Sequence, residues 1–163
     1  MKTLAFALAL VAGPFALFAR EIPSKTASAT ARSAVLLADV STKNAPISQQ
    51  MKITVGKRVF TATLQNNPTA DTFKRLLPLS LNMRDVNRNE KAFDLSSDLP
   101  TADANPRTIQ AGDLMIWSSR TVVVFYKGFS TPYSYTRLGQ IDDPTGLAEA
   151  LGAGNVTVTL ELR

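Results

Sequence analysis

Two continuous apolar runs lie near the middle of this chain, Leu114-Met115-Ile116-Trp117 and Thr121-Val122-Val123-Val124-Phe125-Tyr126. Only Ser118-Ser119-Arg120 separates them, which suits a tight turn. A short apolar run bounded by turn residues is typical of a strand that is buried on both faces. The stretch therefore predicts a hairpin at the centre of a β-sheet.

The sequence on both sides of this hairpin alternates between apolar and polar residues, with the period of two that half-buried strands show. Gly56-Lys57 separates the first two alternating segments and suits a hairpin turn that needs a positive φ. The pattern predicts strands over residues 51–55, 58–65, 79–84, 133–141 and 156–162.

Two short helices are also expected. Asn67-Pro68 and Asp143-Pro144 each place a capping residue before a proline, which is a signal for a helix start, and Gly152 is expected to end the second helix. Residues 85–107 are polar and predict a long irregular segment, interrupted by a strand fragment at Ala92-Phe93. The whole pattern predicts a mainly β fold, a barrel-like sheet whose open ends are covered by the two short helices.

The composition excludes several kinds of chemistry. The 163-residue chain contains no cysteine and no histidine, so it has no disulfide, no thiolate or imidazole metal ligand, and no Ser-His or Cys-His nucleophile pair. We therefore expect no metal site and no cofactor. Hydrolase or transferase chemistry also lacks a recognisable nucleophile and base.

The basic charge of the chain is spread thinly. The formal net charge is +5, but residues from Met51 onward carry 13 basic and 11 acidic side chains and so contribute only +2. No run of Lys and Arg is present that would follow a phosphate backbone. We therefore expect no nucleic-acid partner.

The N-terminal region is expected to direct export. Residues 1–19 begin with Met-Lys-Thr and continue as an apolar stretch that ends in Ala19, which is typical of a secretory signal peptide. Cleavage after Ala19 or near Ala27-Ser28-Ala29 would leave no stable membrane anchor; an uncleaved anchor is the alternative. Residues 20–50 are interpreted as a disordered spacer and residues 51–163 as one domain, located in the periplasm or cell envelope.

Several segments, in their order along the chain, resemble the bacterial cyclophilin-like fold family. They are Asn67–Ala70, Leu77–Leu79, Asn89–Lys91, Gly112–Trp117, Val122–Tyr126, Phe129–Gly139 and Asp142–Pro144. The resemblance implies a small closed β-barrel like that of cyclophilins, in a family whose activity is largely unassigned. The chain lacks the Phe-His-Arg segment, with its catalytic arginine, and the Gly/Asn-rich segment of cyclophilin-type peptidyl-prolyl isomerases.

A candidate ligand-binding surface lies on the strand predicted over residues 133–141. Tyr133, Tyr135 and Arg137 are spaced two apart and should project from one face, where two rings and a guanidinium group could bind a peptide or a small polar molecule. Apolar walls and one further contact complete the set of candidate ligand-binding residues: Met83, Glu90, Trp117, Phe129, Tyr133, Tyr135 and Arg137.

Structural interpretations compete with this site. A Tyr-Ser-Tyr-Thr-Arg strand can be an ordinary half-exposed face, and a tryptophan in an apolar run is usually core. Residues 84–91 offer carboxylates and amides at calcium-like spacing, but they lack the glycine and terminal glutamate of a calcium loop, and a solvated loop fits them better. Asp142-Asp143 resembles a pair of acids but is explained by the predicted helix cap.

We therefore expect an exported domain that binds a peptide or small polar ligand without established catalysis. The alternative is a weak peptidyl-prolyl isomerase with Arg137 as its donor. This reaction needs no nucleophile, because its barrier of about 18–20 kcal/mol comes from amide resonance and falls when a pocket favours the twisted amide.

Overall fold

The computed structural model describes residues 49–163. The predictions for the signal peptide over residues 1–19 and for the spacer up to residue 48 lie outside these residues. The described elements are β1 (Gln50–Val55), β2 (Arg58–Leu64), α1 (Pro68–Lys74), β3 (Leu79–Val86), β4 (Glu90–Asp94), β5 (Thr108–Ile109), β6 (Asp113–Trp117), β7 (Thr121–Phe125), β8 (Phe129–Ser130), β9 (Thr136–Ile141), α2 (Leu147–Leu151) and β10 (Val156–Leu162).

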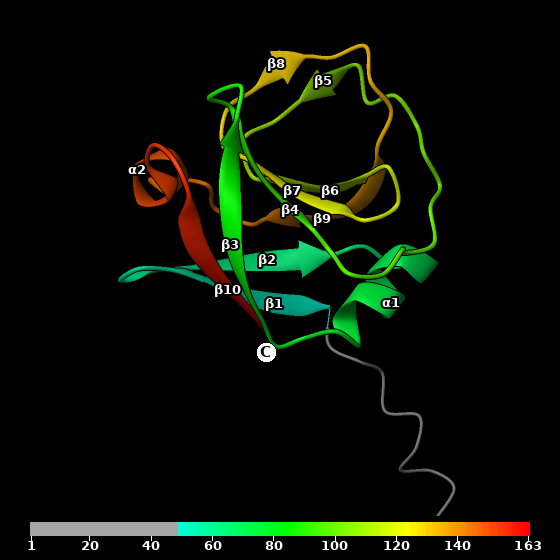
Figure 1. Cartoon of the computed structure of the whole chain (residues 1–163), viewed down its shortest axis with the longest axis horizontal. Helices are drawn as coiled ribbons and strands as arrows, with labels where there is room; N and C mark the ends of the chain where they lie inside the picture. The colour runs from blue at the N-terminus through cyan, green and yellow to red at the C-terminus, as the bar shows by residue number, and fades with distance from the viewer. Residues whose placement is uncertain (1–48) are drawn as a thin grey trace, which may run out of the picture. The chain divides into compact units, whose positions relative to one another are not determined.

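Eight of these strands form a closed antiparallel barrel in the order β1-β10-β3-β4-β7-β6-β9-β2 (Figure 1). The two apolar runs form the predicted hairpin, in which Leu114 pairs with Val124 and Ile116 with Val122. The first and last described strands are neighbours, because β1 pairs with both β2 and β10. The mainly β fold with a closed barrel and two short helices is thus confirmed.

The barrel interior holds the main hydrophobic core. Alternate residues of each strand point inward, so that Ile53 of β1 lies opposite Phe60 of β2 and Leu160 of β10, and all three are buried. Burying one such side chain contributes about 1.5–3 kcal/mol.

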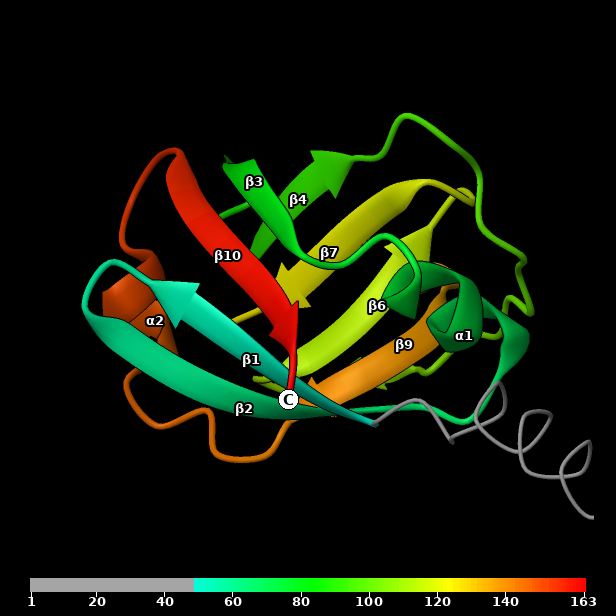
Figure 2. The ribbon, with the colours of Figure 1, turned by 90° about the horizontal axis from the view of Figure 1, so that it is seen from below.

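The helices lie at opposite ends of the barrel (Figures 1 and 2). The predicted cap of α1 is confirmed, because the Asn67 side chain accepts a hydrogen bond of 2.8 Å from the backbone N–H of Ala70. The predicted cap of α2 is wrong: Asp143 instead accepts a hydrogen bond from the N–H of Thr145, and the helix begins after Gly146. Gly152 ends α2 as expected. Neither helix within residues 49–163 is long and apolar enough to cross a membrane.

The polar segment after residue 85 contains more regular structure than its sequence predicts. Strand β3 continues to Val86, and β4 is a full strand of five residues that pairs with both β3 and β7. Asn87 and Arg88 turn the chain with positive φ angles of 52° and 58°, a combination typical of tight hairpins. The irregular segment is therefore limited to residues 95–107.

A second, smaller hydrophobic cluster lies on the outside of the barrel. It is built from Ile109, Met115, Val123, Phe125 and Tyr135, with Phe129 packed against it. Met115 and Val123 face each other across β6 and β7 and point away from the interior. The two-stranded sheet of β5 and β8 lies apart from the barrel strands and supplies Ile109 and Phe129 to this cluster (Figure 1). This outer cluster positions the candidate site.

Candidate functional site

The candidate site is a pocket on the outer face of β3, β4, β7 and β6. Strand register aligns outward side chains into rows across this face. In one row Glu90 lies between Val86 of β3 and Phe125 of β7, and in the next Ala92 lies between Arg84 and Val123. In the last row Thr121 lies opposite Trp117 of β6. Because side chains alternate along each strand, these outward side chains lie together and form the floor of the pocket.

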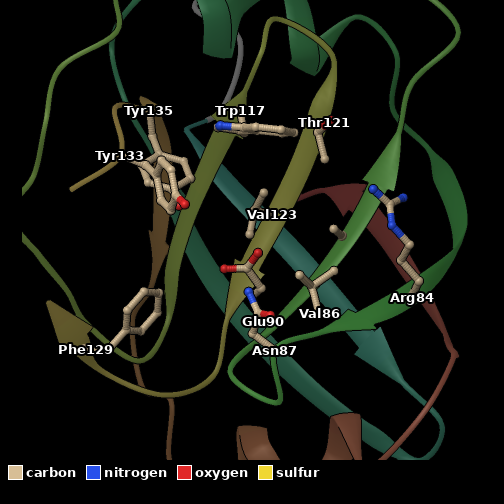
Figure 3. Close-up of a pocket in the computed structure, with 11 residues that line it drawn as sticks. Arg84, Val86, Asn87, Glu90, Trp117, Thr121, Val123, Phe129, Tyr133 and Tyr135 are labelled. Atoms are coloured by element: carbon tan, nitrogen blue, oxygen red, sulfur yellow. The ribbon is translucent and has the colours of Figure 1, made fainter. Parts of the chain in front are cut away.

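Aromatic side chains surround this floor. Tyr133 and Tyr135 come from the segment before β9 and Phe129 from β8, while Trp117 ends β6 (Figure 3). The cavity has a volume of about 200 Å³, smaller than the ~300–1,000 Å³ of pockets for drug-sized molecules, so it suits one side chain or a small headgroup. The residues that line it are Arg84, Val86, Asn87, Glu90, Ala92, Trp117, Thr121, Val123, Phe129, Tyr133 and Tyr135.

The inner wall of the pocket is rigidly packed. Tyr135 is buried, and its ring meets that of Phe125 edge-on at a centroid distance of 5.6 Å. Phe129 packs against the same Phe125 ring at 5.7 Å. Backbone hydrogen bonds between Tyr135 and Ala104 fix the segment. Burial raises the pKa of the Tyr135 hydroxyl, which is therefore neutral and can donate a hydrogen bond.

The rim of the pocket is open to solvent. Tyr133 is 62% exposed and Trp117 is 48% exposed, although both are large apolar side chains. A large aromatic side chain in water gives up hydrophobic stabilisation that burial would provide. The two rings thus offer contact surface to a ligand.

Glu90 supplies the pocket's one carboxylate. Burial raises the pKa of this carboxyl group to about 7, against a smaller opposing effect of the Arg84 charge. No hydrogen bond or ion pair within residues 49–163 engages the Glu90 carboxylate, which points into the pocket between Val123 and Asn87 (Figure 3). Glu90 is therefore a half-buried acid that titrates near neutrality and is available to a ligand.

Arg84 lines the opposite side of the pocket, but its guanidinium group is already paired. Its Nη1 donates to the Asp94 carboxylate at 3.0 Å, and Asp94 also accepts a hydrogen bond of 2.6 Å from the Thr121 hydroxyl. These bonds and the neighbouring charges lower the pKa of Asp94. The Arg84 charge is thus directed to Asp94, away from Glu90.

The structure brings five of the seven predicted site residues to this pocket: Glu90, Trp117, Phe129, Tyr133 and Tyr135. Met83 and Arg137 are not among the lining residues. Met83 is fully buried in the barrel core, because the alternation of β3 points it inward. Arg137 is half-exposed and lies 3.8 Å from the carboxylate of the buried Asp113.

The expected strand over residues 133–141 is shorter in the structure and begins at Thr136. Tyr133 and Tyr135 therefore lie in an irregular segment, where the two-residue spacing does not place all three predicted side chains together. A bulge between Leu114 and Met115 also shifts the pairing of β6 with β9. Both irregularities explain why Arg137 is separated from the tyrosines.

Sequence reasoning missed the floor of the pocket. Arg84, Val86, Asn87, Ala92, Thr121 and Val123 line it but were not among the predicted site residues. One signal was present: Glu90, Ala92 and Asp94 alternate with Lys91 and Phe93. This alternation marks the strand whose outward face forms the floor.

The calcium-like spacing of residues 84–91 does not form a cation site. Asp85 is engaged by the Lys91 ammonium group at 2.6 Å and by the Tyr126 hydroxyl at 2.9 Å. Within residues 49–163 no group of three or more acidic side chains is arranged to hold a metal ion.

Comparison with known proteins agrees with this architecture. The model of the cyclophilin-like family matches residues 53–161. The solution structure of the hypothetical protein AF2241 from Archaeoglobus fulgidus is similar at a TM-score of 0.51 and 14% identity, covering 74% of this chain and 99% of that chain; this likeness shows the fold alone. No curated protein matches the chain. Because the matched residues are most of the 163-residue sequence, the protein belongs to the cyclophilin-like family.

Proposed function

We propose that this cyclophilin-like protein is an exported ligand-binding protein of the cell envelope, which takes a peptide side chain or a small polar molecule into the outer pocket. One observation supports this most: aromatic residues from β6, β8 and the segment before β9 converge on one cavity. The same cavity holds the Glu90 carboxylate, which has no partner in the part of the chain that the structure describes. Apolar walls with a few directed polar groups are the usual composition of small-ligand sites.

Binding without catalysis fits the residues of the pocket better than an enzyme does. The chain contains no histidine or cysteine. The Thr121 hydroxyl at the cavity donates to the Asp94 carboxylate, but the pKa of Asp94 is lowered, which makes this carboxylate a weak base. The exposed rings of Trp117 and Tyr133 are suited to non-covalent contact with a ligand, not to forming or breaking its bonds. We do not propose peptidyl-prolyl isomerisation, because Arg137 is not a lining residue and the Arg84 guanidinium is paired with Asp94.

The export part of the proposal rests on the apolar segment of residues 1–19. Expression of the full chain in a Gram-negative host should yield a shortened protein in the periplasmic fraction. Recovery of the full-length protein from the cytosol would contradict export and would leave the binding proposal standing.

Trp117 allows binding to be measured directly, because it is the one tryptophan of the chain and lies on the pocket. We suggest titrating the protein with acetylated tetrapeptide amides that present each standard side chain in turn, while Trp117 fluorescence is recorded. At least one peptide should give a saturable change.

The matched variants for this titration are Tyr133→Ala at the rim and Val59→Ala on β2, which remove side chains that are 62% and 60% exposed. Tyr133→Ala should weaken binding by about tenfold, since rings at binding sites contribute roughly 1–2 kcal/mol, while Val59→Ala should not change it. The absence of any saturable change, or an equal loss in both variants, would contradict the proposal.

A further inference from the structure

We infer that the pocket selects ligands that carry an alkylated, positively charged amine, which the aromatic rings surround and the Glu90 carboxylate neutralises. This inference rests on the proposed function, because it names the ligand class of the same pocket. It is carried by the arrangement of rings around one carboxylate that has no partner among residues 49–163.

The aromatic rings of the pocket suit a cation. Trp117, Tyr133, Tyr135 and Phe129 border the cavity on neighbouring sides, with Trp117 at one end and Phe129 towards the other (Figure 3). The faces of aromatic rings carry negative electrostatic potential and attract cations within about 6 Å, most strongly for alkylated ammonium groups that lose little hydration. A neutral apolar group would gain only the contact area.

The Glu90 carboxylate suits a cation as well. A carboxylate that is removed from water needs a positive partner or hydrogen-bond donors, and Glu90 has neither within residues 49–163. Lys91, the next residue along β4, is not a partner, because its side chain points to the other side of the strand and bonds Asp85 there. A ligand cation would therefore supply the missing partner.

The charges around the pocket favour a cation over an anion. The one guanidinium group among the lining residues, that of Arg84, is paired with Asp94 at 3.0 Å. An anionic ligand would meet the Glu90 carboxylate and the ring faces without a free positive group. A metal ion is also a poor fit, because the walls are apolar and offer a single carboxylate.

Binding of a cation at Glu90 should depend on pH. Arg84 from β3 and Tyr133 and Tyr135 from the segment before β9 line the pocket with Glu90. The hydroxyl groups of Tyr135 and, from the opposite side of β4, Tyr126 also interact with the Glu90 charge. Both hydroxyls have raised pKa values and stay neutral, so Glu90 itself changes charge near pH 7. Because a cation binds the ionised carboxylate, affinity should rise from about pH 6 to about pH 8.

The experiment compares choline with 3,3-dimethylbutan-1-ol, its neutral isostere of the same shape, by titration of Trp117 fluorescence. The variants are Glu90→Gln and, as a matched control, Glu149→Gln, which changes an exposed glutamate on α2. Tyr133→Ala is the second pocket variant, since an exposed side chain can be removed without loss of the fold.

We expect wild type and Glu149→Gln to bind choline at least about tenfold more tightly than the isostere, with the predicted rise in affinity with pH. Glu90→Gln should lose this preference and the pH dependence, and Tyr133→Ala should weaken choline binding. Equal binding of the two probes, or no effect of Glu90→Gln, would overturn the cation inference and leave the proposed pocket intact. A lack of response to both probes would also overturn it, while the peptide titration decides the proposed function independently.

Discussion

Two neighbouring residues of β4, Glu90 and Lys91, carry opposite charges and point to opposite sides of the same strand. Lys91 is fully buried, and its ammonium group donates to Asp85, to the carbonyls of Gly152 and Gly154, and lies over the Tyr126 ring. Glu90 is half-buried and has no such partner within residues 49–163.

This difference distinguishes the Lys91 charge, which is bonded within the protein, from the Glu90 charge, which is available to a ligand. Lys91 connects β4 to the turn after α2, so its burial is compensated inside the protein. Glu90 faces a cavity, and its burial is compensated by nothing in the described chain but the more distant Arg84 charge. We interpret the first as part of the fold and the second as part of a binding site.

The largest expected effect on stability comes from replacing Lys91. Lys91→Met removes the ammonium group that donates to the Asp85 carboxylate and to the carbonyl groups of Gly152 and Gly154. The free energy of unfolding, measured with urea, should fall by about 3 kcal/mol. Arg120→Met, which breaks an exposed pair with Asp98, is the control and should cost less than about 1 kcal/mol. Equal losses of unfolding free energy in the two variants would show that the buried Lys91 charge stabilises the fold no more than an exposed ion pair does.

Replacing Glu90 should change the free energy of unfolding in the opposite direction from replacing Lys91. Because burial raises its pKa from 4.5 to about 7, the folded state binds this proton more tightly than the unfolded state. The stabilisation is present at low pH and is lost as pH rises from about 4.5 to about 7. The full difference in pKa corresponds to about 3.4 kcal/mol, which solvent screening of this half-buried side chain reduces to about 2 kcal/mol.

Glu90→Gln should therefore be more stable than wild type above about pH 7, by that amount, and similar to it near pH 4. Urea unfolding at several pH values measures this difference, with Glu149→Gln as the control. A stability difference that does not depend on pH would contradict the account of a desolvated carboxylate.

A smaller effect compares two tyrosine hydroxyls on the two sides. Tyr126→Phe removes the hydroxyl that donates to Asp85 at 2.9 Å and should cost about 1 kcal/mol of stability. Tyr133→Phe removes an exposed hydroxyl at the pocket rim and should cost less than about 0.5 kcal/mol. Thermal unfolding of both variants measures the two stability losses. A larger loss of stability in Tyr133→Phe than in Tyr126→Phe would contradict the stabilising role of the hydrogen bonds around Lys91 and Asp85.

The barrel could be predicted from the sequence, because apolar alternation and turn residues act locally. The hairpin of residues 114–126 and the strands at both ends of the domain follow from such patterns. Strand β4 was predicted only as a fragment, because its second residue, which is buried, is a lysine. A buried lysine is stable only where distant carbonyl groups meet it, and no local pattern indicates that Gly152 and Gly154 would do so.

The aromatic part of the site could be predicted and its floor could not. Trp117, Tyr133 and Tyr135 are unusual as residue types, so they are recognisable in a sequence. Ala92 and Val123 become lining residues only because the register of β4 with β7 places them side by side. Arg137 illustrates the same limit, since the bulge at Leu114 and Met115 changes its neighbours.

The availability of Glu90 to a cationic ligand is tested most directly by nuclear magnetic resonance titration of its side-chain carboxyl carbon, in the absence and presence of saturating choline. We predict a pKa of about 7 for the free protein and a clearly lower pKa with choline bound, because the cation stabilises the carboxylate. A pKa near the ordinary value of 4.5 in the free protein, unchanged by choline, would contradict the account.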